Sequence, residues 1–445
     1  MPIYVLNAPA AAGTRSIDAR PGAVLPRMVP RSCELQDYAA VEVPGFQVNG
    51  RLIAYASPDS TFAVTKRLID AARESILIGI YDFSAPYIEE MILAAMTRGV
   101  AVTLMLDIDS KKESDLLKRL MEMGTTGVSA PSCANPTVHV FSSSHEKVIV
   151  IDDEWVLVQS GNYSANSIPM NVEDGGEAGF RPGNRDTGLA IQSRELAAFF
   201  KRILEADMAR VPEVRAAPQE PAEDAWLLVE RAPTRRPKRL FPSSAFDLAE
   251  PLAVQPVLSP DNYMKVVPGL LAQARKSVLI EQQYIRSAQP LVAQLLAAIA
   301  EARKAAPELD VRIVLGKLFD QKDVEKEKQN LENLAATYGL RLADNIRYIN
   351  TDELVHCHNK MVIVDGKSVL ISSQNWSDSA VSRNREAGVW MTHEGIAGYF
   401  AAIFETDWAS AFQTLPGTGE PEVMARDGLR SGGFVRVERG DYEEV

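Results

Sequence analysis

Two short segments of the chain combine a histidine, a lysine and an aspartate at the same spacing. The first is HEKVIVID over residues 145–152, and the second is HNKMVIVD over residues 358–365. Because successive side chains of a strand point to opposite faces, His145 and Lys147 share one face of the first segment. The second segment repeats this with His358 and Lys360. Each segment therefore predicts an imidazole and an ammonium group side by side at one end of a buried strand.

The aspartates that end the two segments fall on the opposite face. By the same alternation, Asp152 and Asp365 point away from the histidine and the lysine of their own segment. We predict a structural hydrogen-bonding role for both aspartates, with no direct part in chemistry.

A serine and an asparagine follow each of these strands. The first copy is QSGN, with Ser160 and Asn162, and the second is SSQN, with Ser373 and Asn375. The hydroxyl and amide groups are expected on neighbouring strand ends, close to the lysines. They are candidates for binding the oxygens of a phosphate group.

Two imidazoles, two ammonium groups and two amides suit a tetrahedral anion. The lysines and asparagines would hold phosphoryl oxygens while the two imidazoles act from opposite sides. Phosphodiester cleavage fits this set. One imidazole attacks phosphorus to give a covalent phosphohistidine, and the other protonates the departing oxygen and then activates water. This chemistry requires no metal and no other cofactor.

Each histidine also needs an acceptor that orients its second ring nitrogen. The frame N-R-[DE]-x-G occurs once in each half of the chain and supplies Asp186 and Glu386. These acids are the candidates for that supporting role.

The two histidine segments belong to an extensive internal repeat. SPDS at 57–60 recurs as SPDN at 259–262, and ARESILI at 72–78 recurs as ARKSVLI at 274–280. Further on, FFKRILEADMA at 199–209 is matched by YFAAIFETDWA at 399–409. The blocks keep their order, which indicates a duplicated unit.

With its two H-x-K-x4-D segments, each followed by S-x-N, the chain resembles the phospholipase D superfamily over roughly residues 51–412. The resemblance implies two similar α/β sandwich domains related by a pseudo-twofold axis and sharing one site. It implies His145 as the nucleophile and His358 as the general acid. It further implies phosphate binding by the lysines and asparagines, with Asp186 and Glu386 supporting the histidines across the two halves. One departure is that Gln159 and Ser372 stand where the family has glycine.

The order of apolar segments predicts how the domains are arranged. Each half alternates amphipathic and β-branched stretches, which indicates an α/β fold. One predicted helix covers residues 323–338 and closes at Gly339 in a left-handed C-cap. We divide the chain into an N-terminal extension (1–50), a first repeat (51–210), a linker rich in proline and charge (211–256), a second repeat (257–412) and a C-terminal tail (413–445).

Composition narrows the classes of protein. The chain has 445 residues, 46% of them hydrophobic, and a net charge of −12, which predicts a soluble two-domain protein that does not adsorb loosely to polyanions. Three cysteines spread over this length argue against a disulfide framework, so we predict a reducing, cytoplasmic compartment, although a trimmed secretion signal stays open. No stretch has the ~20 apolar residues of a membrane span. A lipid substrate would thus be met by transient contact with a membrane surface.

These observations favour one function and leave a second open. The first is a monomeric phospholipase D type enzyme that hydrolyses or transfers phospholipid head groups. Because no span is found, the sequence argues against a membrane-anchored cardiolipin synthase. The alternative is a metal-independent nuclease, which the net charge of −12 disfavours. A catalytically inactive binding module is disfavoured because both motifs are intact.

Several segments have two interpretations. The extra segment 168–184 is either a flap over the substrate or a tolerated surface loop. The basic stretch 231–239 is either a solvated linker or an attractor of phosphate groups. Trp376 either lines the site or packs in the core.

Other side chains near the motifs allow further interpretations. His356 with His358 forms an H-x-H pair, but no further ligands complete a metal site, so we predict that His356 is a neighbour of the active site. Glu281, Gln282 and Gln283 follow a buried strand and could extend to the cleft.

Overall fold

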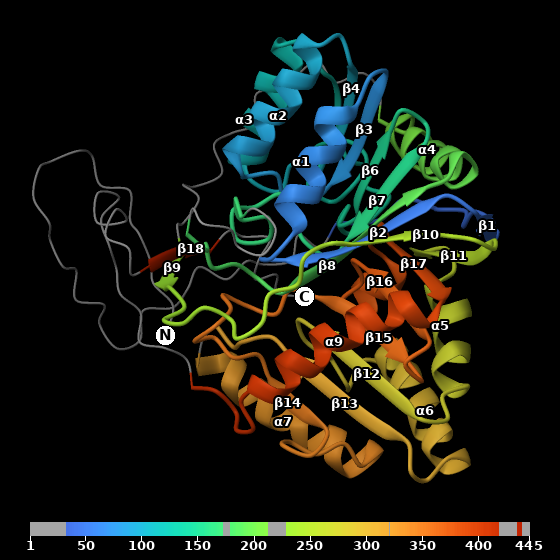
Figure 1. Cartoon of the computed structure of the whole chain (residues 1–445), viewed down its shortest axis with the longest axis vertical. Coiled ribbons are helices and arrows are strands. Elements are labelled where there is room, and N and C mark those ends of the chain that lie inside the picture. The colour runs from blue at the N-terminus through green and yellow to red at the C-terminus, as the bar shows by residue number, and fades with distance from the viewer. Residues whose placement is uncertain (1–32, 172–178, 212–227, 320, 418–433, 438–445) are drawn as a thin grey trace, which may run out of the picture.

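The computed structural model describes residues 33–171, 179–211, 228–319, 321–417 and 434–437. Figure 1 shows two lobes stacked on one another, the first half of the chain above and the second half below. Each lobe is built on a mixed sheet of eight strands with helices against it. The predicted α/β class, with two similar sandwich domains, is confirmed.

The first sheet combines parallel and antiparallel strands. In spatial order it contains β10 (Ser244–Asp247), β2 (Arg51–Ser57), β8 (Asp186–Gln192), β7 (Trp155–Gln159), β6 (Lys147–Ile151), β3 (Ser75–Ile80), β4 (Ala101–Leu106) and β5 (Thr126–Ser129). The pairs β3·β4 and β4·β5 are parallel, and the other pairs are antiparallel.

The second sheet repeats this order with its own strands. They are β1 (Phe46–Val48), β11 (Leu252–Ser259), β17 (Glu386–Thr392), β16 (Ser368–Ser372), β15 (Lys360–Val364), β12 (Ser277–Gln282), β13 (Asp310–Leu315) and β14 (Ile346–Tyr348). Strands β6 and β15, which carry the two histidine motifs, occupy equivalent central positions, so the motifs are equivalent in space as well as in sequence.

Helices cover both faces of each sheet. In the first half they are α1 (Thr61–Ala71), α2 (Pro86–Thr97), α3 (Lys111–Glu122) and α4 (Arg194–Met208). In the second half they are α5 (Tyr263–Ala272), α6 (Pro290–Ala305), α7 (Gln321–Tyr338), α8 (Asp378–Ser382) and α9 (Glu394–Ser410). Gly339 follows α7 with φ +64° and its N–H donates to the carbonyl of Ala335, as its predicted role as a C-cap requires.

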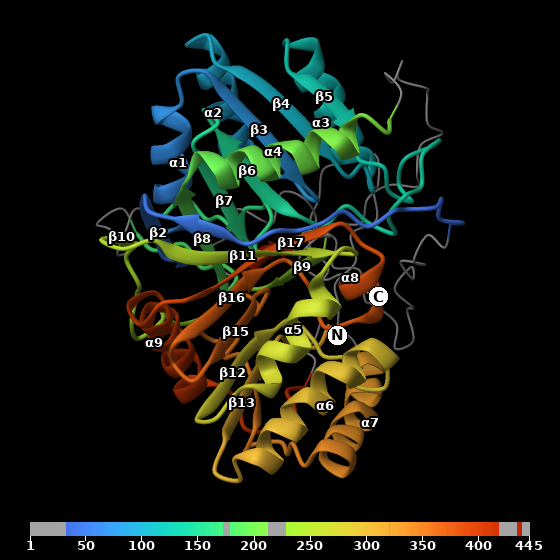
Figure 2. The ribbon, with the colours of Figure 1, turned by 90° about the vertical axis from the view of Figure 1, so that its right-hand side faces the viewer.

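The hydrophobic core runs through both halves. Alternate residues of β6 point to different cores, Val148 to the one shared with α4 and Ile149 to the one under α1–α3. The core under α4 continues into the second half, where it includes Phe400 and Phe404 of α9. Figure 2 shows α4 against the sheet of the upper lobe and α9 against the sheet of the lower lobe. The halves therefore share apolar packing.

Two edge strands lie in segments that the sequence analysis left outside the repeats. β1, from the N-terminal extension, pairs with β11 of the second sheet. β10, from the segment predicted to be a linker, pairs with β2 of the first sheet. The predicted linker 211–256 also contains β9 (Leu228–Arg231), which pairs with β18 (Phe434–Val437) from the predicted tail. Strands this short carry too few residues for a periodic pattern, and their distant partners decide that they form.

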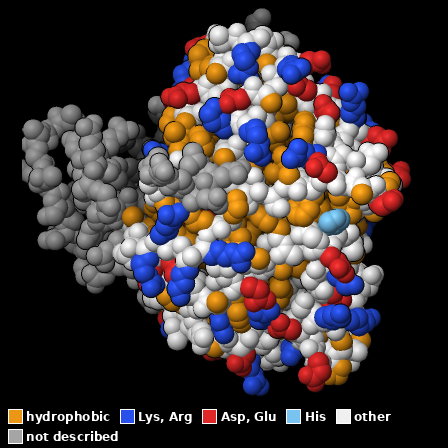
Figure 3. All heavy atoms as spheres, viewed as in Figure 1, with side chains coloured by type: hydrophobic (Ala, Val, Ile, Leu, Met, Phe, Trp, Pro, Cys, Tyr) orange, Lys and Arg blue, Asp and Glu red, His pale blue; other side chains and the backbone are white. Residues whose placement is uncertain are grey.

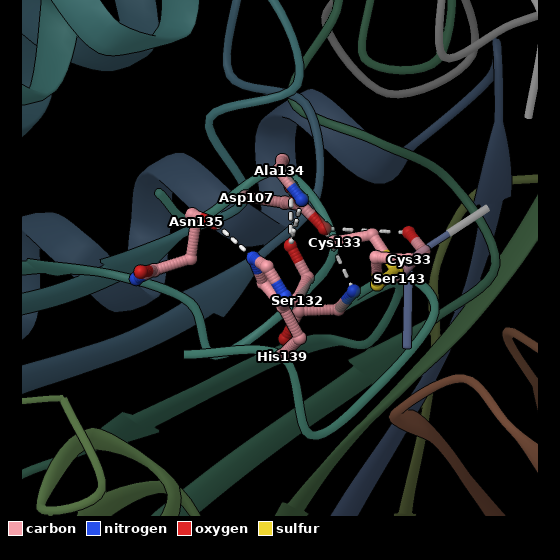
Figure 4. Close-up of a disulfide and its surroundings, with 9 residues drawn as sticks. Cys33, Asp107, Ser132, Cys133, Ala134, Asn135, His139 and Ser143 are labelled. Atoms are coloured by element: carbon pink, nitrogen blue, oxygen red, sulfur yellow. Dashed lines mark hydrogen bonds between the residues drawn. A yellow bond between two sulfur atoms is a disulfide. The ribbon is translucent and has the colours of Figure 1, made fainter. Parts of the chain in front are cut away.

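The prediction of no disulfide is wrong. Cys33 and Cys133 form a disulfide with a Cα–Cα distance of 5.6 Å, and Cys357 is a buried free thiol. The bond fastens the N-terminal strap, which we define as residues 33–45, to the loop that leads to the first histidine motif (Figure 4). Sequence spacing cannot show which cysteines of a long chain meet in space.

Within the described ranges, no helix is both long and apolar enough to cross a membrane.

Candidate active site

The two histidine motifs meet at the boundary between the lobes. His145 lies two residues before the start of β6 and His358 two residues before the start of β15, and both side chains are fully buried. The lysines begin these strands and are also buried. Parallel bridges join Ser144 to Arg385 and Arg185 to Cys357, so each motif lies against the N-R-[DE] segment of the other half.

Each histidine pairs with a carboxylate of the opposite half. Nδ1 of His145 lies 2.8 Å from Oε2 of Glu386, and Nδ1 of His358 lies 3.0 Å from Oδ1 of Asp186. Glu386 begins β17 and Asp186 begins β8. A carboxylate at Nδ1 favours the tautomer that carries its proton there and turns Nε2 to the chemistry. This is the crossed arrangement that the resemblance implies.

Burial sets the protonation of these carboxylates. Burial raises the pKa of Asp186 to about 6 and that of Glu386 to about 7, and the charges of both lysines act in the opposite direction. Because Lys147 and Lys360 both act on both carboxylates, the two half-sites form one electrostatic unit.

The motif lysines are held by the chain next to them. Nζ of Lys147 donates to the carbonyl of His145 at 2.6 Å, and Nζ of Lys360 donates to that of His358 at 2.8 Å. Nζ of Lys360 also lies 3.0 Å from Nε2 of His358. A lysine beside the reactive ring nitrogen is well placed to hold an oxygen of a bound phosphate.

The serines have a different position from the one predicted. The sequence analysis assigns Ser160 and Ser373 to phosphate, but their hydroxyls donate to the carboxylates of Asp186 (2.8 Å) and Glu386 (2.5 Å). Each hydroxyl also accepts a backbone N–H from the residue after that carboxylate. The serines therefore orient the acids that orient the histidines.

The asparagines fit the predicted role better. Asn162 is fully buried, and neither atom of its amide has a hydrogen-bond partner among the described residues. Oδ1 of Asn375 is likewise unpartnered there. A buried amide that the protein leaves unsatisfied is typical of a ligand-binding position.

The motif aspartates bind backbone away from the reacting groups. Asp152 accepts the N–H groups of residues 73–75 at 2.8 to 3.2 Å, and Asp365 accepts those of residues 275–277 at 2.7 to 3.1 Å. These bonds lower the pKa of both aspartates even though burial acts against them. Each aspartate therefore fixes the start of the strand next to its motif.

Two buried arginines that the sequence analysis did not single out clamp the halves together. Arg185 donates through Nε to Asp407 of α9 at 2.6 Å and through Nη1 to Asp59 at 3.1 Å. Its counterpart Arg385 makes the same contacts in reverse, with Asp207 of α4 at 2.6 Å and Asp261 at 2.5 Å. All six residues lie in the repeated blocks, in N-R-[DE], SPD and the paired helices. The signal that could have found them is a charged residue that recurs at the same position of both repeats, next to residues predicted to be buried.

The structure also places the other side chains near the motifs for which the sequence allowed more than one interpretation. Trp376 is buried in the core and donates to the hydroxyl of Tyr263 at 3.1 Å. His356 is buried, accepts the N–H of Lys317 at 3.2 Å, and has a pKa that burial lowers well below its usual value. Glu281 is buried and accepts from Asn359.

The two uncertain segments are described only in part. Residues 172–178 of the extra segment lie outside the described residues, and Asn171 bonds to the carbonyl of Pro58 at 2.8 Å beside them. In the basic stretch, Arg235 pairs with Asp352 of the second half at 3.0 Å. The basic stretch therefore lies on the second half of the protein.

The chain is similar in sequence to known proteins. The family described as "Cardiolipin synthase, PLD-like domain" matches residues 65–208 and 269–408. Cardiolipin synthase A of Pseudomonas aeruginosa is 22% identical over 377 residues, which is 83% of this chain and 69% of that protein. A phospholipase D of Rickettsia bellii is 31% identical over 106 residues, which is 24% of this chain and 49% of that protein.

The fold is also similar to a solved structure. The phosphatidylserine synthase of Haemophilus influenzae superposes with a TM-score of 0.56 at 15% sequence identity, over 84% of this chain and 90% of that one. Together with the duplicated motifs and the crossed pairs, these matches establish the family. The chain belongs to the phospholipase D superfamily, with two repeats, and is a phosphodiester-acting enzyme of that type.

Proposed function

We propose that this enzyme cleaves the head-group phosphodiester of a phospholipid and passes the phosphatidyl group to water or to an alcohol. The observation that carries the proposal is the crossed pairing, in which a carboxylate of the opposite half orients each imidazole. This pairing supports a site in which both imidazoles act on one phosphate. Around them lie two lysines and an asparagine whose amide is unsatisfied among the described residues. Such a site holds a phosphoryl group without a metal ion.

In the first step, Nε2 of His145 attacks phosphorus. The N–P bond forms as the P–O bond to the head group breaks, and His358 gives its Nε2 proton to the departing oxygen. Glu386 stabilises the positive charge that develops on His145. The lysines and asparagines offset the negative charge on the phosphoryl oxygens.

In the second step, the phosphohistidine is resolved. His358, now neutral, takes the proton of water or of an acceptor alcohol as its oxygen attacks phosphorus. The new P–O bond forms while the N–P bond breaks, which returns His145 to its starting state. The same site can therefore hydrolyse or transfer, depending on which hydroxyl enters.

Lipid is favoured over nucleic acid by charge and by the relatives. The net charge of −12 opposes binding to a polyanion. On the face seen in Figure 3, the described lysine and arginine side chains are interspersed with acidic ones. The relatives named above are a cardiolipin synthase and a phospholipase D, whose names refer to phospholipids.

The test compares substrates directly. Purified protein in chelator receives phosphatidylcholine vesicles, phosphatidylglycerol vesicles or single-stranded DNA, each with and without glycerol as an acceptor. We expect head-group release or transfer from lipid, intact DNA, and loss of both lipid reactions in His145→Ala and His358→Ala. Cleavage of DNA with untouched lipid would instead establish the nuclease alternative.

A further inference from the structure

A buried glutamate beneath the second histidine motif is not used by the mechanism above. Glu281 lies on β12 and is fully buried. Its Oε2 accepts a hydrogen bond from Nδ2 of Asn359 at 2.8 Å, and Asn359 lies between His358 and Lys360 in the chain.

Asn359 connects this glutamate to the opposite half of the protein. Its Oδ1 accepts from Oγ1 of Thr187 at 2.6 Å and from the backbone N–H of Lys360 at 3.0 Å. Thr187 is the residue after Asp186, the carboxylate paired with His358. The bonds Glu281–Asn359–Thr187 therefore span the boundary beside that pair, and they hold the backbone on both sides of it.

The charges around Glu281 do not balance when all its neighbours are ionised. The carboxyl group of Asp407 is in hydrogen-bonding contact with Glu281, and Arg185 is the nearby cation. Arg185 also binds Asp59, so three carboxyl groups share one guanidinium in a buried place. The buried thiol of Cys357 is a further titratable neighbour.

One proton removes this conflict. Oε1 of Glu281 has no hydrogen-bond donor among the described residues. Two carboxyl groups in contact are stable when a single proton lies between them, because like charges in a buried site repel strongly.

We propose that Glu281 is a positioning residue of the active site, which is protonated beside Asp407 and, through Asn359 and Thr187, holds the His358 strand against the half that carries Asp186. Burial, followed by the charge of Asp407, raises the pKa of Glu281 from 4.5 to about 8, in agreement with the geometry. Deprotonation at higher pH adds a buried negative charge next to Asp407 and loosens this contact.

Among the described residues, the first half has no equal of the bonds through Asn359. Gly79 occupies the place of Glu281, and a Cβ there would lie 2.5 Å from Leu204. Glu146 occupies the place of Asn359, and it accepts from the hydroxyl of Ser144 in its own half. Glu146 is also a buried carboxyl group, and burial together with the charge of Asp207 raises its pKa to about 7. The bridge through Asn359, but not the presence of a buried carboxyl group, is thus specific to the side of His358.

Variants of Glu281 separate positioning from simple packing. Two measurements test the inference. The first is turnover of bis(4-nitrophenyl) phosphate, and only this measurement rests on the proposed function. In Glu281→Ala we expect kcat to fall tenfold or more while KM changes less than twofold, because the residue does not touch substrate. Glu281→Gln, whose amide replaces the protonated acid, should restore most of kcat and keep activity to a higher pH than the parent enzyme.

A measurement without substrate tests the proton itself. A carboxyl group whose pKa is raised on folding contributes stability at low pH, and this is lost as pH rises from about 4.5 through about 8. The free energy of unfolding of the parent protein should therefore decline over this window. In Glu281→Gln the free energy of unfolding should decline less steeply with pH, by up to the slope that corresponds to one proton. This result does not depend on which substrate the enzyme uses.

Glu327→Gln is the matched control. Glu327 is a buried carboxyl group of α7 whose pKa burial raises, but it bonds to Tyr348 and lies away from the boundary. Its substitution should change the pH dependence of stability and leave the pH profile of turnover as it was. If Glu281→Gln retains the full proton linkage of the parent, or if Glu281→Ala keeps the parental kcat and pH profile, the proposal is overturned.

Discussion

The two half-sites lie at equivalent positions of the two sheets, but the side chains around the two histidines differ. Beside His145, the ring of Tyr81 packs edge-on at 5.0 Å and donates its hydroxyl to Asp109 at 3.0 Å. Beside His358, the neighbouring ring is that of His356, at 6.5 Å, which packs against Phe319 at 5.1 Å.

The carboxylates differ too. Glu386 brings both oxygens within 2.9 Å of its histidine, whereas Asp186 is bonded through one. Duplication thus supplied two equivalent scaffolds, and changes around them gave the imidazoles unequal environments. Unequal environments are what a mechanism with one nucleophile and one proton donor requires.

The largest expected effect separates the two histidines. Loss of either imidazole should lower turnover by about 10⁵-fold, because nucleophile and proton donor act as a unit. Quenching with denaturant at alkaline pH, where the P–N bond survives, should trap a phosphorylated protein in His358→Ala, where breakdown is slow, and none in His145→Ala.

One contact favours the reverse assignment. Nζ of Lys360 lies 3.0 Å from Nε2 of His358, and a charged lysine there disfavours a protonated ring. Trapped phosphoprotein in His145→Ala alone would therefore exchange the two roles, and phosphoprotein in neither variant would exclude the covalent mechanism.

The carboxylates should give the next largest effect. Glu386→Gln and Asp186→Asn keep the shape and remove the charge that orients each ring, so kcat should fall by about 10²- to 10⁴-fold. Because Glu386 supports the nucleophile, its substitution should slow formation of the phosphoprotein in a single turnover. Asp186→Asn should slow formation and breakdown together, since His358 acts in both steps. Equal effects of both variants on both steps would remove the functional distinction between the half-sites.

The chemistry of this site was more predictable than its framework. The paired lysines and the supporting acids follow from local motifs, because H-x-K and N-R-[DE] sit at strand ends whose pattern is clear. That the acids cross between the halves was implied by the resemblance to the family. Strands β6 and β15 begin at the predicted lysines. In contrast, β1 and β10 have three and four residues and form only because a distant edge is available. Phosphate was predicted as the partner of the hydroxyls of Ser160 and Ser373, which in this structure donate to Asp186 and Glu386. Sequence does not show which of two nearby acceptors a hydroxyl reaches.

The arginine clamps should affect stability more than chemistry. Arg185→Ala or Arg385→Ala leaves buried carboxylates without their cation, which should cost about 3–5 kcal/mol of unfolding free energy. One difference between the networks is that Nη2 of Arg385 also donates to the hydroxyl of Tyr38 in the N-terminal strap at 2.8 Å. Tyr38→Phe should therefore cost about 1 kcal/mol and only on this side. Urea unfolding of the three variants measures these differences, and an equal cost for Tyr38→Phe and Arg385→Ala would contradict them.

The smallest expected effect on catalysis concerns the disulfide, which has no counterpart in the second half. Cys33–Cys133 holds the strap from which Tyr38 reaches Asp261 at 2.8 Å, so the bond supports one of the two arginine networks and not the other. Its loss in a Cys33→Ser/Cys133→Ser variant should lower the free energy of unfolding by about 2–4 kcal/mol. Kinetic constants should change little, because the described strap residues contact Asp261, Arg385 and the loop that leads to the first histidine motif, which support the reacting groups from outside the site. Adding reductant should destabilise the parent protein by a similar amount and leave the double variant unchanged. A reductant effect of equal size on the double variant would show that the stabilisation comes from elsewhere.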